Sequence, residues 1–161
     1  MSAKTEKFQF KNRNNHVLDG MLEWPAKKPK AFAIFAHCFT CSKNIKAASV
    51  ISKKLTDSGI AVLRFDFTGI GNSEGDFSNS GFSSNVQDLE DASSALSEKF
   101  ESPSLLIGHS LGGAAVLSAA QNISSIKAVV AIAAPSSPKH VEKHMECSVD
   151  EIKTKGKAKV K

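Results

Sequence analysis

Hydrophobic and polar positions along the chain alternate between a pattern typical of buried strands and a pattern typical of amphipathic helices. Short apolar runs predict buried strands, and these runs are 31–36, 60–65, 104–107 and 128–134. Between them apolar residues recur every three or four positions, which predicts helices over 42–57, 82–100 and 111–122. Two earlier strands, at 8–10 and 17–24, are expected to pair antiparallel. The alternation predicts an α/β fold with a largely parallel, doubly wound sheet of about six strands.

Local signals mark several ends of these elements. Ser42 is expected to cap the first helix, and Gly59 follows that helix where a C-terminal glycine commonly lies. Glycine, serine and asparagine are frequent over 68–80, which predicts a long loop. The periodicity weakens from Pro135 onward. We therefore expect one domain over 1–146 and, over 147–161, a lysine-rich tail or an unpaired strand.

The charge of the chain changes this picture little. The 161 residues carry a formal net charge of +5, but lysine occupies every second position from 153 to 161. Without those five lysines the basic and acidic residues balance. The chain also has no basic stripe interleaved with aromatic residues, so we predict no nucleic-acid partner.

No segment has the composition of a membrane span or of a secretory signal. The longest apolar run, 128–134, is far shorter than the ~18 residues that a spanning helix needs. The first ten residues contain no apolar signal core, so we predict a cytoplasmic protein without a membrane partner. Three cysteines, an odd number, argue against a disulfide scaffold as the organising principle.

The strongest chemical motif is Gly-x-Ser-x-Gly at 108–112, placed between a predicted strand and a predicted helix. A serine hydroxyl is a weak nucleophile, so it must project from a sharp turn where a base can reach it. Small residues on either side allow the flanking backbones to approach closely. The pattern predicts Ser110 as the nucleophile and the Leu111 N–H as an oxyanion donor. The plainer alternative is a glycine-rich turn with a bystander serine.

Two further motifs accompany this one. Phe-Ala-His-Cys-Phe-Thr at 35–40 follows a predicted strand, and Arg-Phe-Asp-Phe-Thr-Gly-Ile-Gly-Asn-Ser at 64–73 follows the next. Together with 108–113 they resemble the α/β-hydrolase superfamily. The closest resemblance is to bacterial hydrolase domains that are often fused to an OsmC-like peroxide-reducing domain. It extends from Phe8 to His144, and no OsmC-like portion lies within the 161 residues.

The resemblance implies roles for individual residues. The second oxyanion donor is expected to be the N–H of Phe39, ahead of that of Cys38, which replaces the glycine usual in the family. His37 is expected to brace its loop and Asp66 to tie a loop, neither taking part in catalysis. The implied activity is hydrolysis of a small carboxylic ester, or less favourably an amide, through an acyl-enzyme at Ser110.

The family's catalytic triad runs serine, then an acid, then histidine along the chain. The candidates after Ser110 are His140, Glu142, His144, Glu146, Asp150 and Glu151. The two histidines would share a helix face, as a base, a metal pair or, as we favour, solvent-facing residues. We therefore expect the N-terminal portion of a hydrolase fold, truncated at its C-terminal end and impaired in activity. Self-association or a partner segment is expected to cover the truncated edge of the sheet.

A second interpretation rests on the pair Cys38 and Cys41. Cys-x-x-Cys at a strand-to-helix junction is typical of thiol redox proteins, because a helix N-terminus makes a thiol more reactive. A zinc site on His37 and these cysteines would lack a fourth ligand other than Cys147, so no metal is predicted. The third alternative is a binding fragment without catalytic activity.

No cofactor is predicted either. The glycines that could suggest a dinucleotide site lie at 69, 71 and 75. That spacing differs from Gly-x-Gly-x-x-Gly, and no predicted helix opens directly behind it.

Overall fold

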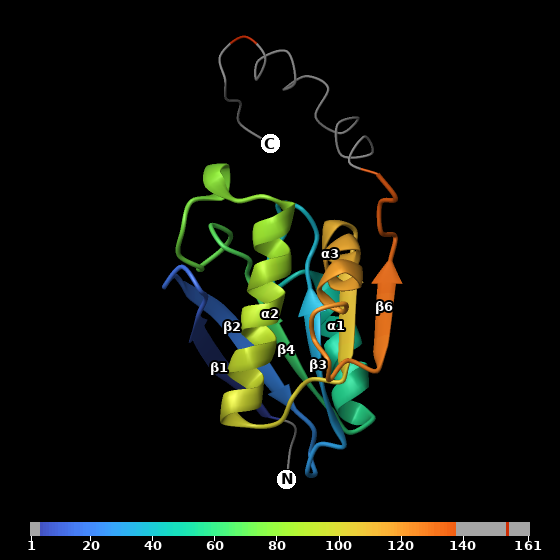
Figure 1. Ribbon diagram of the computed structural model, residues 1–161. Helices are drawn as coiled ribbons and strands as arrows, with labels where there is room; N and C mark the ends of the chain where they lie inside the picture. Colours follow the sequence, from blue (N-terminus) through green and yellow to red (C-terminus); the bar gives the residue numbers. More distant parts are fainter. Residues whose placement is uncertain (1–3, 138–153, 155–161) are drawn as a thin grey trace.

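The computed structural model describes residues 4–137 and 154 (Figure 1). In chain order its elements are β1 (Lys4–Lys11), β2 (Val17–Trp24), β3 (Ala31–Ala36), α1 (Lys46–Asp57), β4 (Ile60–Phe65), the 3-10 helix η1 (Phe77–Asn79), α2 (Phe82–Lys99), β5 (Leu105–His109), α3 (Leu111–Ala119) and β6 (Ala128–Ile132). The predicted strands and helices are therefore all present among the described residues, with different ends at several places.

The six strands form one sheet in the order β1-β2-β4-β3-β5-β6. β1 pairs antiparallel with β2, and β2 pairs antiparallel with β4. The remaining pairs are parallel, and Ala33 of the central β3 lies opposite Val62 of β4 and Leu105 of β5. This confirms the largely parallel, doubly wound sheet. After β4 the chain crosses to the other side of β3, so the carboxyl ends of β3 and β5 flank the point where ligands bind in such sheets.

Helices cover both faces of the sheet, α2 and α3 on one and α1 on the other (Figure 1). Leu89 and Leu96 of α2 and Val116 of α3 are fully buried in the larger core. Burial of each such side chain contributes about 1.5–3 kcal/mol. The smaller core joins Ala48 of α1 to Phe35 of β3.

One predicted helix end is wrong. Ser42 does not cap α1, which begins at Lys46 after Ile45 and has no side-chain cap. The Ser42 carbonyl instead accepts the Ile45 N–H at 3.2 Å in a turn. The reason is tertiary, because the neighbouring Lys43 is held in the interior and the chain cannot become helical there.

Of the other predicted ends, the one at Gly59 is confirmed, and those of the third helix and of the last strand lie at other residues. Gly59 has φ +89° and donates its N–H to the Thr56 carbonyl at 3.0 Å, which confirms it as the residue that ends α1. The third helix stops at Ala119 instead of Asn122 and continues as turns. β6 stops at Ile132, because Ala133 has φ +49° and cannot extend the strand.

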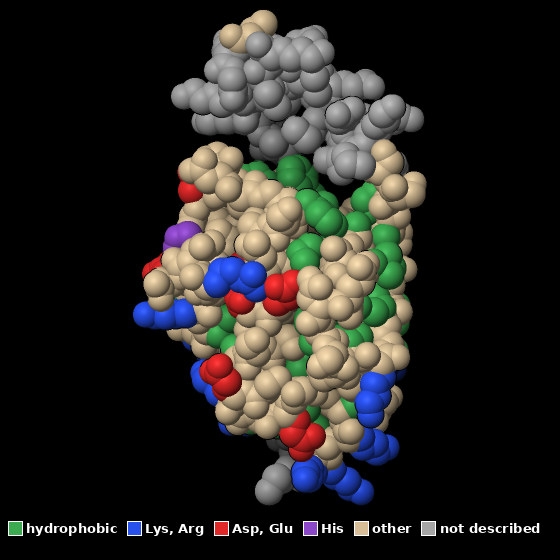
Figure 2. Space-filling model, viewed as in Figure 1, with side chains coloured by type: hydrophobic (Ala, Val, Ile, Leu, Met, Phe, Trp, Pro, Cys, Tyr) green, Lys and Arg blue, Asp and Glu red, His purple; other side chains and the backbone are tan. Residues whose placement is uncertain are grey.

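β6 is the edge strand of the described sheet on one side. Its neighbour α3 exposes half of Leu117, and Val130 of β6 is 45% exposed. Figure 2 shows hydrophobic side chains along β6 and over the adjoining upper surface, whereas charged side chains gather elsewhere on this face. No helix within the described residues is long and apolar enough to cross a membrane. The candidate triad residues after Ser110, and the boundary expected at 146, lie outside the described residues.

Candidate active site

Ser110 is the single residue between β5 and α3. Its backbone has φ +54° and ψ −120°, a conformation that residues other than glycine rarely adopt. Hydrogen bonds hold it on both sides, since its N–H donates to the Ile132 carbonyl at 2.9 Å and its own carbonyl accepts the Gly113 N–H at 2.9 Å. Ser110 thus lies on the sharp strand-to-helix turn that the sequence predicts.

Backbone contact holds this turn together. A Cβ atom on Gly108 would lie 2.2 Å from the Gly112 carbonyl oxygen, and one on Gly112 would lie 2.4 Å from the His37 carbonyl oxygen. Neither contact leaves room for a side chain. The glycines therefore bring the start of α3 against β5 and against the loop that follows β3.

The backbone amides of Leu111 and Phe39 are among those near this contact that have no protein acceptor in the described residues. The Leu111 N–H belongs to the first turn of α3, where helix geometry provides no intrahelical acceptor. The Phe39 N–H belongs to the loop that Gly112 contacts. The positive end of α3 also favours negative charge beside Ser110.

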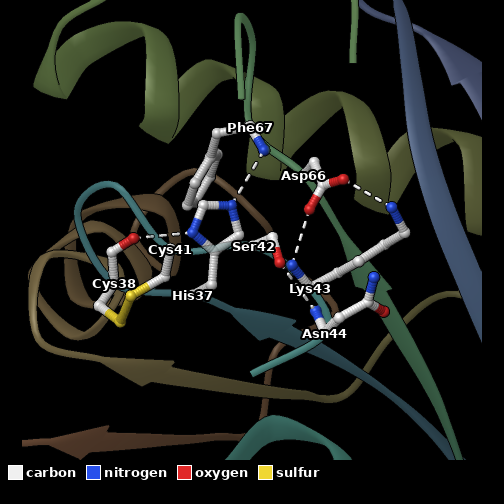
Figure 3. Close-up of a disulfide and its surroundings, with 8 residues drawn as sticks. All are labelled: His37, Cys38, Cys41, Ser42, Lys43, Asn44, Asp66 and Phe67. Carbon is white, nitrogen blue, oxygen red and sulfur yellow. Dashed lines mark hydrogen bonds and ion pairs between the residues drawn. A yellow bond between two sulfur atoms is a disulfide. The ribbon is translucent and has the colours of Figure 1, made fainter. Parts of the chain in front are cut away.

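His37 braces the loop after β3 (Figure 3). Its ring is buried, its Nε2 accepts the Phe67 N–H at 3.2 Å, and its Nδ1 therefore donates to the Cys38 carbonyl at 2.8 Å. Burial lowers the pKa of His37 below 6.5, which favours this neutral form. Both ring nitrogens are used within the protein, so His37 has no free nitrogen to act as a base for Ser110.

A buried ion-pair cluster made of Lys43, Asp66 and Asp19 holds the far end of the same loop (Figure 3 shows Lys43 and Asp66). The Lys43 ammonium lies 2.5 Å from Asp66 and 2.7 Å from Asp19, and its side chain is 4% exposed. The Lys43 backbone N–H also donates to Asp66, at 2.7 Å. Asp66 is therefore occupied by Lys43, in a loop-tying position.

The electrostatics of this cluster favour its charged form. Burial tends to lower the pKa of Lys43, but the hydrogen bonds to Asp19 and Asp66 outweigh burial and raise it. Burial likewise tends to raise the pKa of Asp19, but the hydrogen bond and charge of Lys43, together with Asn72 and Lys7, outweigh burial and lower this pKa. Sequence reasoning missed Lys43, because nothing in its neighbours distinguishes it from an exposed lysine.

Arg64 of β4 also holds Lys43 in place. Its guanidinium donates to the Lys43 carbonyl and, through Nε, to Glu23 at 2.7 Å. Lys43 is thus bound through its backbone N–H, its carbonyl and its side chain.

The loop between these anchors carries a disulfide. Cys38 and Cys41 are bonded, with their Cα atoms 5.2 Å apart, and the Cys41 N–H donates to the Cys38 carbonyl at 3.2 Å. Thr40 between them has φ +57°. The bonded sulfurs are not free thiolates for a metal, and the described residues contain no cluster of three or more metal-ligand side chains.

The glycine-rich loop after β4 packs onto the same cluster. A Cβ atom on Gly71 would lie 2.3 Å from an Asp66 carboxylate oxygen. The Ser73 hydroxyl donates to the Asp66 carbonyl at 2.6 Å and accepts the Asp19 N–H at 2.9 Å. Gly71 therefore allows close packing around Asp66.

A second buried carboxylate, which the sequence did not single out, fastens the start of that loop. Asp88 of α2 accepts the Thr68 N–H at 2.8 Å and an Asn12 amide hydrogen at 3.1 Å. Burial raises the pKa of Asp88.

Comparison with known proteins adds to this geometry. The family described as serine aminopeptidase, S33, matches residues 27–155. The esterase domain of a Rhodothermus marinus protein is 46% identical, with a TM-score of 0.71 over 88% of this chain and 54% of that one. No curated protein sequence matches the chain.

Two more distant structures share the fold. A Pyrococcus furiosus esterase is 19% identical, with a TM-score of 0.77 over 94% of this chain and 59% of that one. The α/β hydrolase GrgF from a Penicillium species is 23% identical, with a TM-score of 0.74 over 98% and 57%. The chain thus spans somewhat more than half the length of these relatives. It belongs to the serine aminopeptidase S33 family of α/β-hydrolases, of whose fold it forms the N-terminal portion.

Proposed function

We propose that the chain is the nucleophile-bearing part of a serine hydrolase that cleaves small carboxylic esters. The observation that carries this proposal is the backbone of Ser110, at φ +54° between β5 and α3. Such a conformation costs about 1–3 kcal/mol and is typical of functional sites. The 46% identity to an esterase domain supports ester over amide as the substrate.

In the proposed reaction the Ser110 hydroxyl oxygen attacks the ester carbonyl carbon while a base takes its proton. The carbonyl oxygen becomes an oxyanion, and its collapse expels the alcohol and leaves an acyl group on Ser110. Water then attacks the acyl-enzyme and releases the acid. No cofactor takes part in this scheme.

We assign the oxyanion to the N–H groups of Leu111 and Phe39. Both amides lack a protein acceptor among the described residues, and their loops are in backbone contact through Gly112. The loss of one such donor typically slows turnover about 10²–10³-fold.

The base and the acid of the triad are unassigned. His37 is committed at both nitrogens and Asp66 to Lys43, while His140 and His144 lie outside the described residues. Without its base, a serine hydrolase keeps a residual rate about 10³–10⁴-fold above that of water, which comes from the oxyanion hole and from binding.

A fluorophosphonate probe tests the proposal, with the adduct located by mass spectrometry. We expect one adduct, on Ser110, and none in Ser110→Ala. Release of p-nitrophenol from a short-chain p-nitrophenyl ester should exceed release of p-nitroaniline from an aminoacyl p-nitroanilide. A folded chain that stays unlabelled over many hours would overturn the proposal, and preference for the anilide would replace ester with amide.

A further inference from the structure

We infer that the Cys38–Cys41 disulfide positions the Phe39 amide, so that the oxidation state of this pair sets the rate of hydrolysis at Ser110. The inference rests on the proposed function, because it takes the Phe39 N–H as an oxyanion donor. It makes the chain a redox-responsive hydrolase, and it gives the Cys-x-x-Cys motif a purpose that does not compete with Ser110.

The loop is fixed at both ends by bonds that do not involve sulfur. His37 is held at both ring nitrogens, and Lys43 is held by Asp66, Asp19 and Arg64. Breaking the disulfide therefore leaves the ends of the loop in place. Any change is confined to residues 38–42, which include Phe39.

Between those ends the described contacts are few. The disulfide is the one covalent link, the Cys41 N–H bonds to the Cys38 carbonyl at 3.2 Å, and the Phe39 ring lies 5.6 Å from that of Phe77. The side chains of Cys38, Phe39 and Cys41 are half-buried, and Thr40 is exposed. The Phe39 peptide is thus restrained by the disulfide and by two hydrogen bonds to its Cys38 carbonyl, from the His37 Nδ1 and from the Cys41 N–H.

The backbone conformation of Thr40 favours movement of the loop when the disulfide is broken. Its φ of +57° is a left-handed conformation, which is strained for a β-branched residue. Cys38 and Cys41 enclose Thr40, so a reduced loop can return it to negative φ. That rotation turns the peptide planes on either side of Thr40. Because the Cys41 N–H bonds to the Cys38 carbonyl, it also pulls on the Cys38–Phe39 peptide and displaces the Phe39 N–H from the oxyanion site proposed above.

The chemistry needs a dithiol reductant and, for the return, a peroxide. A reductant thiolate attacks one sulfur, the S–S bond breaks, and the second reductant thiol resolves the mixed disulfide. Cys38 and Cys41 become two thiols, and the reductant becomes a disulfide. In the return step hydrogen peroxide oxidises one thiolate to a sulfenic acid, and the other thiol displaces water to restore the S–S bond.

The experiment compares the rate of fluorophosphonate labelling at Ser110 in the full chain, oxidised and after reduction by dithiothreitol. Mass spectrometry after iodoacetamide treatment counts the free thiols in each sample. We expect reduction to slow labelling at least tenfold, hydrogen peroxide to restore it, and kcat of ester hydrolysis to fall while KM changes little. Far-ultraviolet circular dichroism should show the same fold in both states.

Three variants separate positioning from a merely structural role. Cys38→Ser/Cys41→Ser should label at the slow rate in either condition, and the matched control Cys147→Ser should keep the full redox response. Thr40→Gly allows positive φ without the cross-link, so we expect it to lose much of the response after reduction. Equal rates in the oxidised and the verified reduced chain overturn this inference alone. Absence of labelling in both overturns the proposed function as well.

Discussion

The two loops that carry the proposed oxyanion amides are held by opposite means. The loop after β3 is fixed by chemistry: a disulfide, a neutral histidine and a lysine buried between two aspartates. The turn after β5 is fixed by space, through the contacts of Gly108 and Gly112 and without charged side chains. A loop held by charge and sulfur responds to pH and redox state, whereas a turn held by close packing responds only to volume.

The largest effect should come from removing the charge that holds the first loop. Lys43→Met leaves Asp19 and Asp66 buried without their cation, which costs about 3–5 kcal/mol. Urea denaturation at pH 7 measures this loss. Lys53→Met is the matched control, because Lys53 is exposed and lies 3.7 Å from the exposed Asp57, so we expect a change under about 0.5 kcal/mol. A cost below about 1 kcal/mol for Lys43→Met would show that the cluster does not anchor the loop.

The second effect comes from adding volume to the turn. In Gly112→Ala the new Cβ meets the His37 carbonyl oxygen at 2.4 Å and the Ala36 carbonyl oxygen at 2.5 Å, both of them backbone atoms. We expect a loss of about 2–3 kcal/mol in the free energy of unfolding. Gly81→Ala, with open space around its Cβ, is the control and should cost less than 1 kcal/mol, about what a weaker helix cap costs. Equal stabilities of the two variants would contradict the role of close packing.

A smaller effect tests whether the backbone of Ser110 is strained. Ser110→Gly should be more stable than Ser110→Ala by about 1 kcal/mol, because glycine accepts φ +54° without strain while alanine does not. Both variants lack the hydroxyl, so thermal unfolding compares them without interference from activity. An alanine variant as stable as the glycine variant would mean that the backbone of Ser110 is not strained.

The smallest effect concerns pH and the first loop. Burial lowers the pKa of His37 below 6.5, so below that pH the unfolded chain binds a proton that the folded chain refuses. The contribution of His37 to stability is complete above about pH 6.5 and falls as the pH drops, by at most about 1.4 kcal/mol per pH unit. Urea denaturation from pH 5 to 7.5 on the wild type and on His37→Asn isolates this slope by difference. Identical slopes would show that His37 takes up its proton in the folded state.

The sequence predicted most of the fold, because buried strands and amphipathic helices leave a periodicity that needs no knowledge of partners. The strand-to-helix turn at Ser110 could also be predicted, since glycines at 108 and 112 indicate that two backbone segments approach each other closely there. The loop after β3 was harder to predict from the sequence. Ser42 carries a capping signal that is purely local, and it is overridden by Asp66, which lies 23 residues away from Lys43.

The disulfide and the buried lysine illustrate the same limit. Cys38 and Cys41 could be read as free thiols or as a bonded pair, and only the geometry of the turn decides between them. Lys43 looks like a surface residue until Asp19 of β2 and Asp66 after β4 are brought to one point. Such a meeting depends on the strand order, which local patterns do not encode.

The two edge strands of the described sheet differ in how readily they can pair with another strand. β1 carries the exposed lysines Lys4, Lys7 and Lys11, and charged side chains on an edge strand discourage its pairing with another strand. β6, the opposite rim of the described sheet, consists of Ala-Val-Val-Ala-Ile and offers no such repulsion. Of the two edges of the described sheet, the one at β6 is therefore less protected against pairing with a further strand.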